Sequence, residues 1–372
     1  MNPPPLAFPP TMSIPASLLY GRIATWRRRY VLARPERRRR LRAPVVSVGN
    51  LAVGGSGKTP VVAHVAALLR EAGERPAILS RGYARARHDR EVVVVGTADH
   101  VVAGLDEAGD EPLMLARSLE GVAVVVAADR HLAGCVAESR LGCTVHVLDD
   151  GFQHVQLVRD VDLLLATPAD LHGERVLPAG RLREPVEAAR MADALLVTDG
   201  ELADVATVAD GLGLERRFVT RRSLRVPRMI EPYGTPPRQP RSAPVLAVAG
   251  IARPERFFSD LASADWTLVA SEAYPDHHRF TRGDVEHVAA RVRETGAALV
   301  LTTEKDLVRW LPLAPLPFPL AWVPLDVRVE PSADFGRWLV ARVRGARQAR
   351  AGEAGSPGGA VQIPAAPGEG GR

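Results

Sequence analysis

The sequence predicts an α/β fold, in which a mostly parallel sheet is covered by helices and a second, smaller α/β unit follows. Short runs rich in Val, Leu and Ile alternate with helix-length segments from residue 44 to about residue 198, and the alternation resumes after residue 243. Uninterrupted aliphatic runs are typical of parallel strands that are buried on both faces. The 372 residues indicate two domains, and 46% hydrophobic with 24% charged residues exclude a disordered, collagenous or many-pass membrane protein.

The chain is expected to begin with a basic arm over residues 1–43. Ten arginines and one glutamate give this arm a net charge of +9, which leaves −4 for the rest of a chain whose total is +5. Between residues 15 and 32, four apolar residues recur at the spacing of one helix face: Leu19, Ile23, Trp26 and Tyr30. An apolar face followed by a cationic block is typical of an interfacial helix on an anionic membrane surface. A basic helix docked on the body, or bound to nucleic acid, is the alternative.

Residues 44–224 are expected to form the larger domain. Its predicted strands are Pro44–Val48, Pro76–Leu79, Glu91–Val95, Val122–Ala127, Thr144–Leu148, Val161–Ala166 and Ala194–Val197. A Pro- and Arg-rich linker or hairpin at 225–243 leads to the smaller domain, 244–345, which is expected to end in a helix. The strands predicted there are Pro244–Ala249, Trp266–Ala270, Ala297–Leu301 and Ala321–Val327. Residues 346–372 are mostly Ala, Gly and Pro, so a disordered tail is expected.

The strongest motif is the segment from Ala52 to Thr59, Ala-Val-Gly-Gly-Ser-Gly-Lys-Thr, which follows the first predicted strand and precedes a helical pattern. This is the context of a phosphate-binding P-loop, in which glycines let backbone N–H groups converge on phosphate oxygens at a helix N-terminus. Lys58 is expected to bridge the β- and γ-phosphates, and the Thr59 hydroxyl to ligate Mg²⁺. The predicted nucleotide contacts are Val53, Gly54, Gly55, Ser56, Gly57, Lys58, Thr59 and Pro60.

Two adjacent aspartates, Asp149 and Asp150, directly follow the predicted strand Thr144–Leu148. P-loop enzymes place a carboxylate near Mg²⁺ at the end of such a strand. One aspartate is expected to serve the metal, directly or through water, and the sequence leaves open which one. The alternative is an Asp-Asp-Gly turn that only caps the next element.

Asp110 lies in Gly109-Asp110-Glu111-Pro112, directly ahead of a helical pattern. An acid at this position is often only a helix cap, and the residues alone favour that interpretation. The functional alternative is a general base that accepts a proton from a substrate hydroxyl.

Arg183 and Glu184 lie in a Leu-Arg-Glu-Pro segment. A guanidinium can neutralise charge on a transferring phosphoryl group, and the glutamate can approach Mg²⁺. An ordinary ion pair within a loop explains the segment about as well.

His277 and His278 are adjacent, so on a regular element their side chains diverge. Without a further His/Cys cluster nearby in the sequence, a zinc site is not expected. One of the two is more plausible as the partner of a catalytic acid. The chain contains 46 arginines but only two lysines, Lys58 and Lys305, and the second follows a predicted strand in Thr-Thr-Glu-Lys-Asp. We expect a strand-to-helix turn with ion pairing there and assign no further role.

Taken in order, the P-loop and the Gly-Asp-Glu-Pro, Asp-Asp-Gly-Phe-Gln-His, Leu-Arg-Glu-Pro, Asp-His-His and Thr-Thr-Glu-Lys-Asp segments resemble those of the tetraacyldisaccharide 4′-kinases of lipid A biosynthesis. The resemblance extends from about Tyr20 to Leu339. It implies transfer of the ATP γ-phosphate to the 4′-hydroxyl of a tetraacylated glucosamine disaccharide 1-phosphate, giving a bisphosphorylated lipid A precursor. It further implies a peripheral enzyme on the cytoplasmic face of the bacterial inner membrane, with no nucleic-acid partner and no obligate protein partner.

The resemblance also implies roles for individual residues. Asp110 would be the base, which reverses the preference for a cap, and His277 would tune it. Arg183 would stabilise the transferring phosphoryl group beside Lys58. The residues implied to support Mg²⁺ are Thr59, Asp149, Asp150 and Glu184. The alternative function is a P-loop nucleotide switch or assembly ATPase that acts on a protein or nucleic-acid partner through the basic arm.

Overall fold

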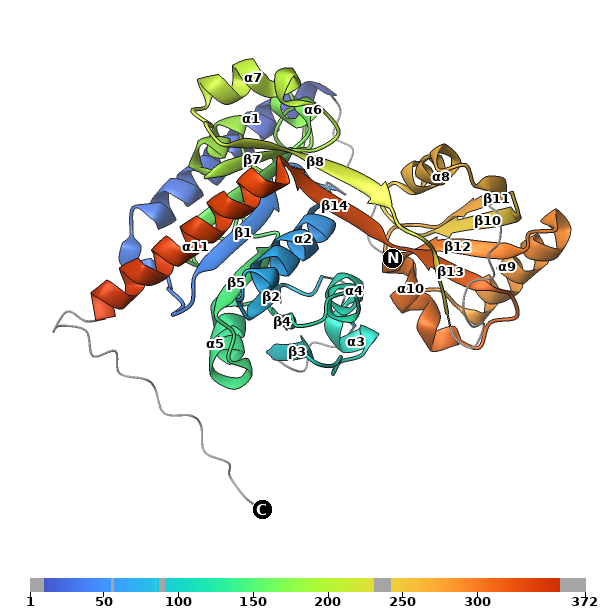
Figure 1. Ribbon diagram of the computed structural model, residues 1–372. Helices are drawn as coiled ribbons and strands as arrows, with labels where there is room; N and C mark the ends of the chain where they lie inside the picture. Colours follow the sequence, from blue (N-terminus) through green and yellow to red (C-terminus); the bar gives the residue numbers. More distant parts are fainter. Residues whose placement is uncertain (1–9, 55–56, 84, 87–90, 231–241, 355–372) are drawn as a thin grey trace.

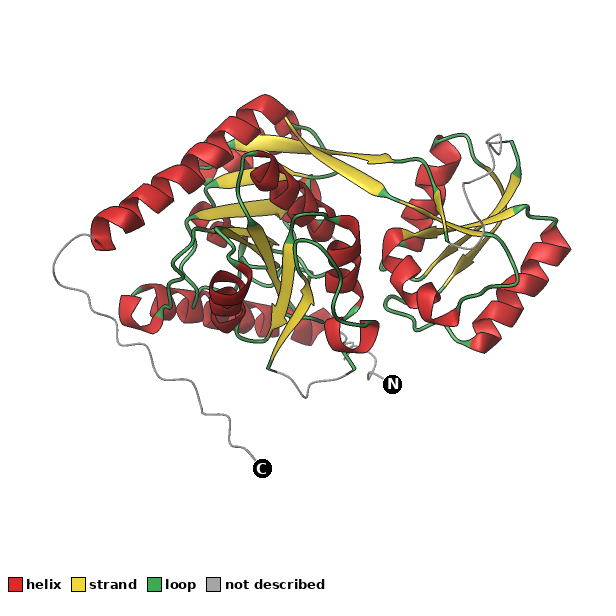
Figure 2. Ribbon diagram, turned by 60° about the horizontal axis from the view of Figure 1, so that its bottom comes forward, coloured by secondary structure: helices red, strands yellow, loops and turns green. Residues whose placement is uncertain are grey.

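The structure is a computed structural model that describes residues 10–54, 57–83, 85–86, 91–230 and 242–354 (Figure 1). Within these residues the strands form two sheets, each flanked by helices, and the two units are joined by long strands that cross between them (Figure 2). The expected α/β class, with a large mostly parallel sheet and a smaller second unit, is confirmed.

The larger sheet has the strand order β14-β8-β7-β6-β1-β5-β2-β4-β3 among the described residues. Its neighbouring pairs are parallel except for the two edges, where β3 runs antiparallel to β4 and β14 antiparallel to β8. Each of the seven predicted runs forms a strand. The strands are β1 (Val45–Asn50), β2 (Pro76–Ser80), β3 (Val92–Gly96), β4 (Ala123–Ala127), β5 (Val145–Asp149), β6 (Val161–Ala166), β7 (Ala194–Val197), β8 (Arg217–Leu224) and β14 (Leu325–Glu330).

Helices cover both faces of this sheet, as runs buried on both sides require. Successive residues of β1 point to opposite faces of the sheet. Val46 and Val48 pack against one group of helices, and Val45 packs against a second group on the other face. The first group is α2 (Lys58–Glu71), α4 (Asp110–Ser118) and α11 (Ser332–Ala354). Opposite them lie α5 (Arg130–Leu141), α6 (Pro168–Leu171) and α7 (Leu202–Gly211). Short helices α3 (Leu105–Ala108), η1 (Pro35–Arg37) and η2 (Val186–Met191) connect these elements.

The smaller sheet has the order β11-β10-β12-β13-β9, and β9 is antiparallel to its neighbour. Its strands are β9 (Arg228–Met229), β10 (Pro244–Ala249), β11 (Thr267–Ala273), β12 (Leu299–Thr303) and β13 (Leu320–Val323). Helix α8 (Pro254–Ser263) packs on one face, and α9 (Arg282–Thr295) with α10 (Glu304–Trp310) packs on the other, followed by η3 (Leu311–Leu313). The core on the second face is built around Trp310, which stacks on Phe280 with ring centroids 3.9 Å apart.

The structure differs from the predicted division of the chain after residue 323. The run predicted as one strand, 321–327, is two strands interrupted at Pro324, and β14 pairs with β8 in the larger sheet. Helix α11 then packs its Phe335 and Leu339 into the core of the larger unit. The last part of the predicted smaller domain therefore belongs to the larger one. The helix also continues to Ala354, into the predicted tail, and residues 355–372 lie outside the described part of the chain.

The predicted arm forms helix α1 (Pro10–Leu32), which docks on the larger unit along a narrow stripe. Ser17 hydrogen-bonds the Val176 carbonyl, and Arg28 lies over the Phe152 ring at 4.5 Å. The predicted apolar face points away from the body: Leu19, Ile23 and Trp26 are 55–64% exposed. The helix is therefore both docked and apolar on its outer face. Among the described residues, none of the helices combines the length and hydropathy needed to cross a bilayer.

Candidate active site

The P-loop connects β1 to α2, as the sequence predicted. Gly54 and Gly57 have φ angles of 99° and 74°, in the left-handed region that glycine enters without steric cost, and Gly57 is the residue that caps α2. Lys58, Thr59 and Pro60 form the first turn of the helix, where a proline is tolerated because the N–H groups there have no partner within the helix. Gly55 and Ser56 lie outside the described residues.

Lys58 is held at the carboxyl edge of the sheet. Its Nζ donates to Asn50 Oδ1, the last residue of β1, at 3.0 Å and lies 3.7 Å from Asp150 Oδ1. The loop itself is tied to a second segment, because Val53 N donates to the Arg181 carbonyl at 2.8 Å. This pairing brings Arg183 to the P-loop from more than 120 residues further along the chain.

Arg183 and Asp150 form a two-pronged ion pair, with both guanidinium nitrogens 2.8 Å from the two carboxylate oxygens. Arg183 also donates to the Asn50 carbonyl at 3.0 Å. Asp150 has φ 54°, an uncommon conformation for a residue with a side chain, which turns its carboxylate back toward the P-loop. Burial alone would raise the pKa of Asp150, but the Arg183 hydrogen bonds and the Lys58 charge outweigh it and lower that pKa.

Asp149 is the more buried of the two aspartates, at the end of β5. It accepts a hydrogen bond from Ser80 Oγ, at the end of β2, at 3.2 Å. Burial, together with the charges of Glu111 and Asp150, raises the pKa of Asp149 above its ordinary value. A buried carboxylate that is surrounded by other negative charges would be stabilised by a bound cation.

Asp110, at the start of α4, is paired with His277 from the smaller unit. The His277 Nδ1 lies 2.8 Å from Asp110 Oδ2, and Asp110 is only 4% exposed. Burial would raise the pKa of Asp110, but the His277 hydrogen bond and the Lys305 charge outweigh it and lower that pKa. His278 turns the other way and binds Asp284 at 3.1 Å, at the start of α9. A φ of 61° at His277 separates the two adjacent side chains.

Glu184 is placed elsewhere. Its Oε2 accepts from Arg28 Nε of α1 at 2.6 Å, and both side chains are almost fully buried. Glu184 and Arg183 are neighbours in sequence, yet the first faces α1 and the second faces the P-loop. The structure does not bring Glu184 together with the other residues predicted to support Mg²⁺.

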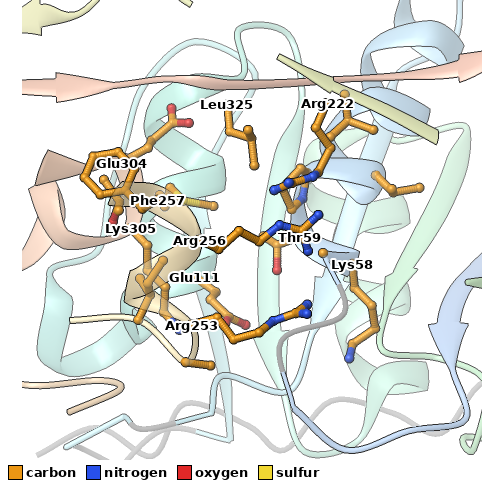
Figure 3. A pocket seen from close by; sticks show the side chains of 18 of the residues that line it. Lys58, Thr59, Glu111, Arg222, Arg253, Arg256, Phe257, Glu304, Lys305 and Leu325 are labelled. Atoms are coloured by element: carbon orange, nitrogen blue, oxygen red, sulfur yellow. Dashed lines mark hydrogen bonds and ion pairs between the residues drawn. The ribbon is translucent and has the colours of Figure 1, made fainter. Parts of the chain in front are cut away.

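A cavity of about 600 Å³ between the two units is lined by residues of both, among them Lys58 and Glu111 of the larger unit and Lys305 of the smaller one (Figure 3). Its walls include the first turn of α2 from the larger unit and the residues that follow β10, β11 and β12 in the smaller one. The carboxyl edges of both sheets therefore face one space, which is where α/β folds bind ligands. The polar residues that line the cavity include Lys58, Thr59, Asp150, Arg183, Glu111, His277 and Lys305.

Sequence reasoning missed three residues of the site. Asn50 contacts both Lys58 and Arg183, and Glu111 and Lys305 pair with each other at 3.0 Å. Asn50 and Glu111 gave a usable signal, since one ends the strand before the P-loop and the other adjoins Asp110. Lys305 was conspicuous as one of two lysines, but only the fold shows that it reaches α4.

Comparisons with known proteins agree with this geometry. A family model described as tetraacyldisaccharide-1-P 4′-kinase matches residues 11–344. The tetraacyldisaccharide 4′-kinase of Pelobacter propionicus is 39% identical over 308 residues, covering 82% of this chain and 84% of the relative. That of Koribacter versatilis is 36% identical, covering 73% of this chain and 80% of the relative.

A solved structure gives the same result. The crystal structure of LpxK from Aquifex aeolicus, described as an apo form in complex with ATP, superposes with a TM-score of 0.72 at 31% identity. The match covers 89% of this chain and 98% of that one. The chain thus belongs to the tetraacyldisaccharide 4′-kinase family, whose members are phosphotransferases with an alcohol group as acceptor.

Proposed function

We propose that this chain transfers the γ-phosphate of ATP to the 4′-hydroxyl of a tetraacyl glucosamine disaccharide 1-phosphate, with Asp110 as the base. The observation that carries the proposal is that a P-loop lysine and an Asp–His pair line or adjoin one cavity. Phosphoryl transfer to an alcohol requires charge neutralisation, an in-line hydroxyl and a proton acceptor. The larger unit supplies the first and the last of these, and the smaller unit supplies the His277 that pairs with the proton acceptor.

ATP would bind with its phosphates at the first turn of α2. Lys58, oriented by Asn50, would contact the β- and γ-phosphates, and Arg183, oriented by Asp150, would approach the transferring group. Arg183 is held by Asp150 and Asn50, so its planar fork is fixed before the nucleotide arrives. Such preorganisation is the main contribution a protein can make to this reaction.

Mg²⁺ fits the oxygen donors present. Among the described residues, no three His, Cys, Asp or Glu side chains gather as a metal-binding group, and Mg²⁺ commonly needs only one or two carboxylates beside phosphate oxygens. Thr59, Asp149 and Asp150 would hold it. A bound cation would offset the burial and the Glu111 and Asp150 charges that raise the pKa of Asp149. The ion would neutralise charge on the phosphates. Glu184 is left out because its carboxylate is buried against Arg28 of α1, whereas Asp150 lines the cavity and is bound by the same Arg183 that would approach the phosphates.

Asp110 would accept the proton of the 4′-hydroxyl. Its lowered pKa keeps it ionised at neutral pH, and a carboxylate has lone pairs beyond those that His277 and the Glu111 N–H occupy. Asp110 itself does not line the cavity, but its neighbour Glu111 and its partner His277 do, so the hydroxyl would approach the carboxylate past these two side chains. The neutral imidazole would orient the carboxylate.

The lipid acceptor accounts for α1. The outer face of the helix exposes Leu18, Leu19, Ile23 and Trp26, and the arm carries a net charge of +9. An apolar face beside cations binds an anionic membrane surface. We therefore place the protein on the cytoplasmic face of the bacterial inner membrane, as a peripheral enzyme.

The test is ATP-dependent transfer of ³²P to the tetraacyldisaccharide 1-phosphate by the full chain with Mg²⁺. We expect labelled lipid, and Asp110→Asn is expected to lower kcat by about 10²-fold or more with little change in the KM for ATP. ATP hydrolysis without labelled lipid would contradict the proposal and favour a nucleotide switch. An equal loss of ATP affinity in Asp110→Asn would contradict the assignment of the base.

A further inference from the structure

Lys305 crosses from the smaller unit to the Asp110–His277 pair. It lies in the first turn of α10, and its ammonium group is 3.0 Å from Glu111 Oε1 and 3.2 Å from Asp276 Oδ1. The same nitrogen lies 3.4 Å from His277 Nε2 and 3.9 Å from Asp110 Oδ2. The lysine side chain is 16% exposed, so these groups interact with it largely out of water.

The ammonium is the charge that lets three carboxylates share this site. Asp110, Glu111 and Asp276 converge on it, and without a cation their mutual repulsion would raise the pKa values of the group. Burial would lower the pKa of Lys305, but Glu111, Asp110 and Asp276 outweigh it and raise that pKa. Lys305 is therefore charged and donates hydrogen bonds only.

The two nitrogens of His277 face partners of opposite character. Nδ1 lies against Asp110, whose ionised carboxylate only accepts, so Nδ1 carries a proton. Nε2 lies against Lys305, which only donates, so Nε2 presents its lone pair. Asp276 Oδ2, 3.6 Å from Nε2, favours the opposite state because it would accept from a protonated Nε2. Lys305 opposes this by binding Asp276 itself.

We propose that Lys305 is a positioning residue that holds His277 as the neutral tautomer protonated on Nδ1, aimed at Asp110. The proposal rests on the function proposed above, since it assigns Asp110 as the base. A neutral imidazole orients the carboxylate without neutralising it, whereas an imidazolium would form an ion pair and weaken the base. His277 and Lys305 of the smaller unit thus control the orientation and the charge of Asp110, which belongs to the larger unit.

The other groups around His277 do not replace Lys305. Arg309 on α10 lies 3.8 Å from Asp110 through Nε but is bound mainly by Asp306, and Glu111 on α4 pairs with Lys305. Tyr83 places its ring centroid 5.4 Å from the imidazole. Among the described residues that the ring faces, Lys305 is the cation that contacts Nε2.

The experiment measures the His277 tautomer by long-range ¹H–¹⁵N NMR on the full chain. His277→Gln assigns the signals among the ten histidines. The variants are Lys305→Met, which removes the charge, and Lys305→Arg, which keeps it. Arg279→Met is the matched control, since it breaks another ion pair between the units, with Asp106 at 2.7 Å, outside the Asp–His pair.

We expect the wild type, Lys305→Arg and Arg279→Met to show His277 protonated on Nδ1 alone near neutral pH. In Lys305→Met we expect Nε2 to gain a proton, because Asp276, no longer bound by the ammonium group, can then accept a hydrogen bond from Nε2. The acid limb of the kcat–pH profile should then move up by about one unit, and kcat near neutral pH should fall about tenfold while the KM for ATP changes less than about twofold.

A wild-type His277 protonated on Nε2, or a tautomer that Lys305→Met leaves unchanged, would overturn the proposal. If Lys305→Met does not fold, the wild type and Lys305→Arg still test the proposal, because both must show His277 protonated on Nδ1 alone. If the wild-type tautomer is as expected but no lipid is phosphorylated, the proposed function fails while the role of Lys305 in setting the imidazole survives.

Discussion

Arg28 of α1 and Glu184 of the loop between α6 and η2 form a buried ion pair, with 2.6 Å between Nε and Oε2. The pair binds the N-terminal helix to Glu184, and the preceding residue, Arg183, contacts Asp150 beside the P-loop. Arg28 Nη2 also donates to the carbonyl of Phe152 at 2.8 Å, and Phe152 follows Asp149 and Asp150 closely in the chain. The helix predicted to meet the membrane is thus attached directly to the segments that build the phosphate site.

Glu184→Gln is expected to lower the free energy of unfolding by about 3 kcal/mol, because removing one partner leaves the buried Arg28 charge uncompensated. The measurement is urea unfolding of the full chain. The double variant Arg28→Met/Glu184→Leu should lose less than the two single changes together, since no charge is left alone. Because Glu184 is not assigned to Mg²⁺, the Mg²⁺ concentration for half-maximal activity should be unchanged in Glu184→Gln. A several-fold increase in that Mg²⁺ concentration would show that Glu184 does contribute to Mg²⁺ binding.

Arg183→Lys is expected to lower kcat by about 10²-fold, because an ammonium cannot make the two parallel hydrogen bonds to Asp150 and also reach Asn50. Steady-state kinetics of lipid phosphorylation measure this. Arg181→Lys is the matched control, since the Arg181 side chain is half exposed and contacts the loop at the Val53 carbonyl, 3.4 Å away, while the backbone hydrogen bond from Val53 N to the Arg181 carbonyl is kept. Equal losses in the two variants would show that the effect is not specific to the fork between Arg183 and Asp150.

Local patterns predicted much of this architecture. The seven aliphatic runs from residue 44 to 197 became seven strands, because a strand buried on both faces has to be apolar throughout. The P-loop was predicted because its glycines, its lysine and its helix are contiguous in sequence. Position alone also predicted that Asp149 and Asp150 would lie at the sheet edge.

Features that depend on distant segments were not predictable in this way. The sheet that β14 joins is decided by its pairing with β8, about 100 residues away, and nothing in its own residues indicates that partner. The choice between His277 and His278 depends on one backbone angle. Glu184 and Arg183 differ in role because Arg28 approaches from 156 residues upstream.

The exposed face of α1 gives a prediction about membrane binding. Ile23→Glu/Trp26→Glu is expected to release the protein from vesicles that contain anionic lipid, because both side chains are more than half exposed and would have to bury a charge. Vesicle co-sedimentation measures this. Val226→Glu is the control, since Val226 is 77% exposed on the linker and lies outside the helix. Binding of the wild type should weaken with salt as the arginines are screened. Unchanged sedimentation of the double variant would rule out this face as the contact.

Glu304 predicts a pH dependence of stability. It lines the cavity next to Lys305, and burial raises the pKa of Glu304 to about 7 although Arg228 and Arg225 oppose the shift. An acid with a raised pKa binds more protons in the folded state, so folding loses stability as pH rises from the unfolded pKa to the folded one. Glu304→Gln removes this loss.

The free energy of unfolding of Glu304→Gln relative to wild type should therefore increase by about 2 kcal/mol between about pH 5 and about pH 8, with little change above that range. Denaturant unfolding at a series of pH values measures it. Glu286→Gln, at an exposed position on α9, is the control and should show no such trend. A constant difference between Glu304→Gln and wild type across this range would mean that Glu304 is already ionised in the folded protein. The acidic wall of the cavity would then carry one more negative charge toward an incoming nucleotide at neutral pH.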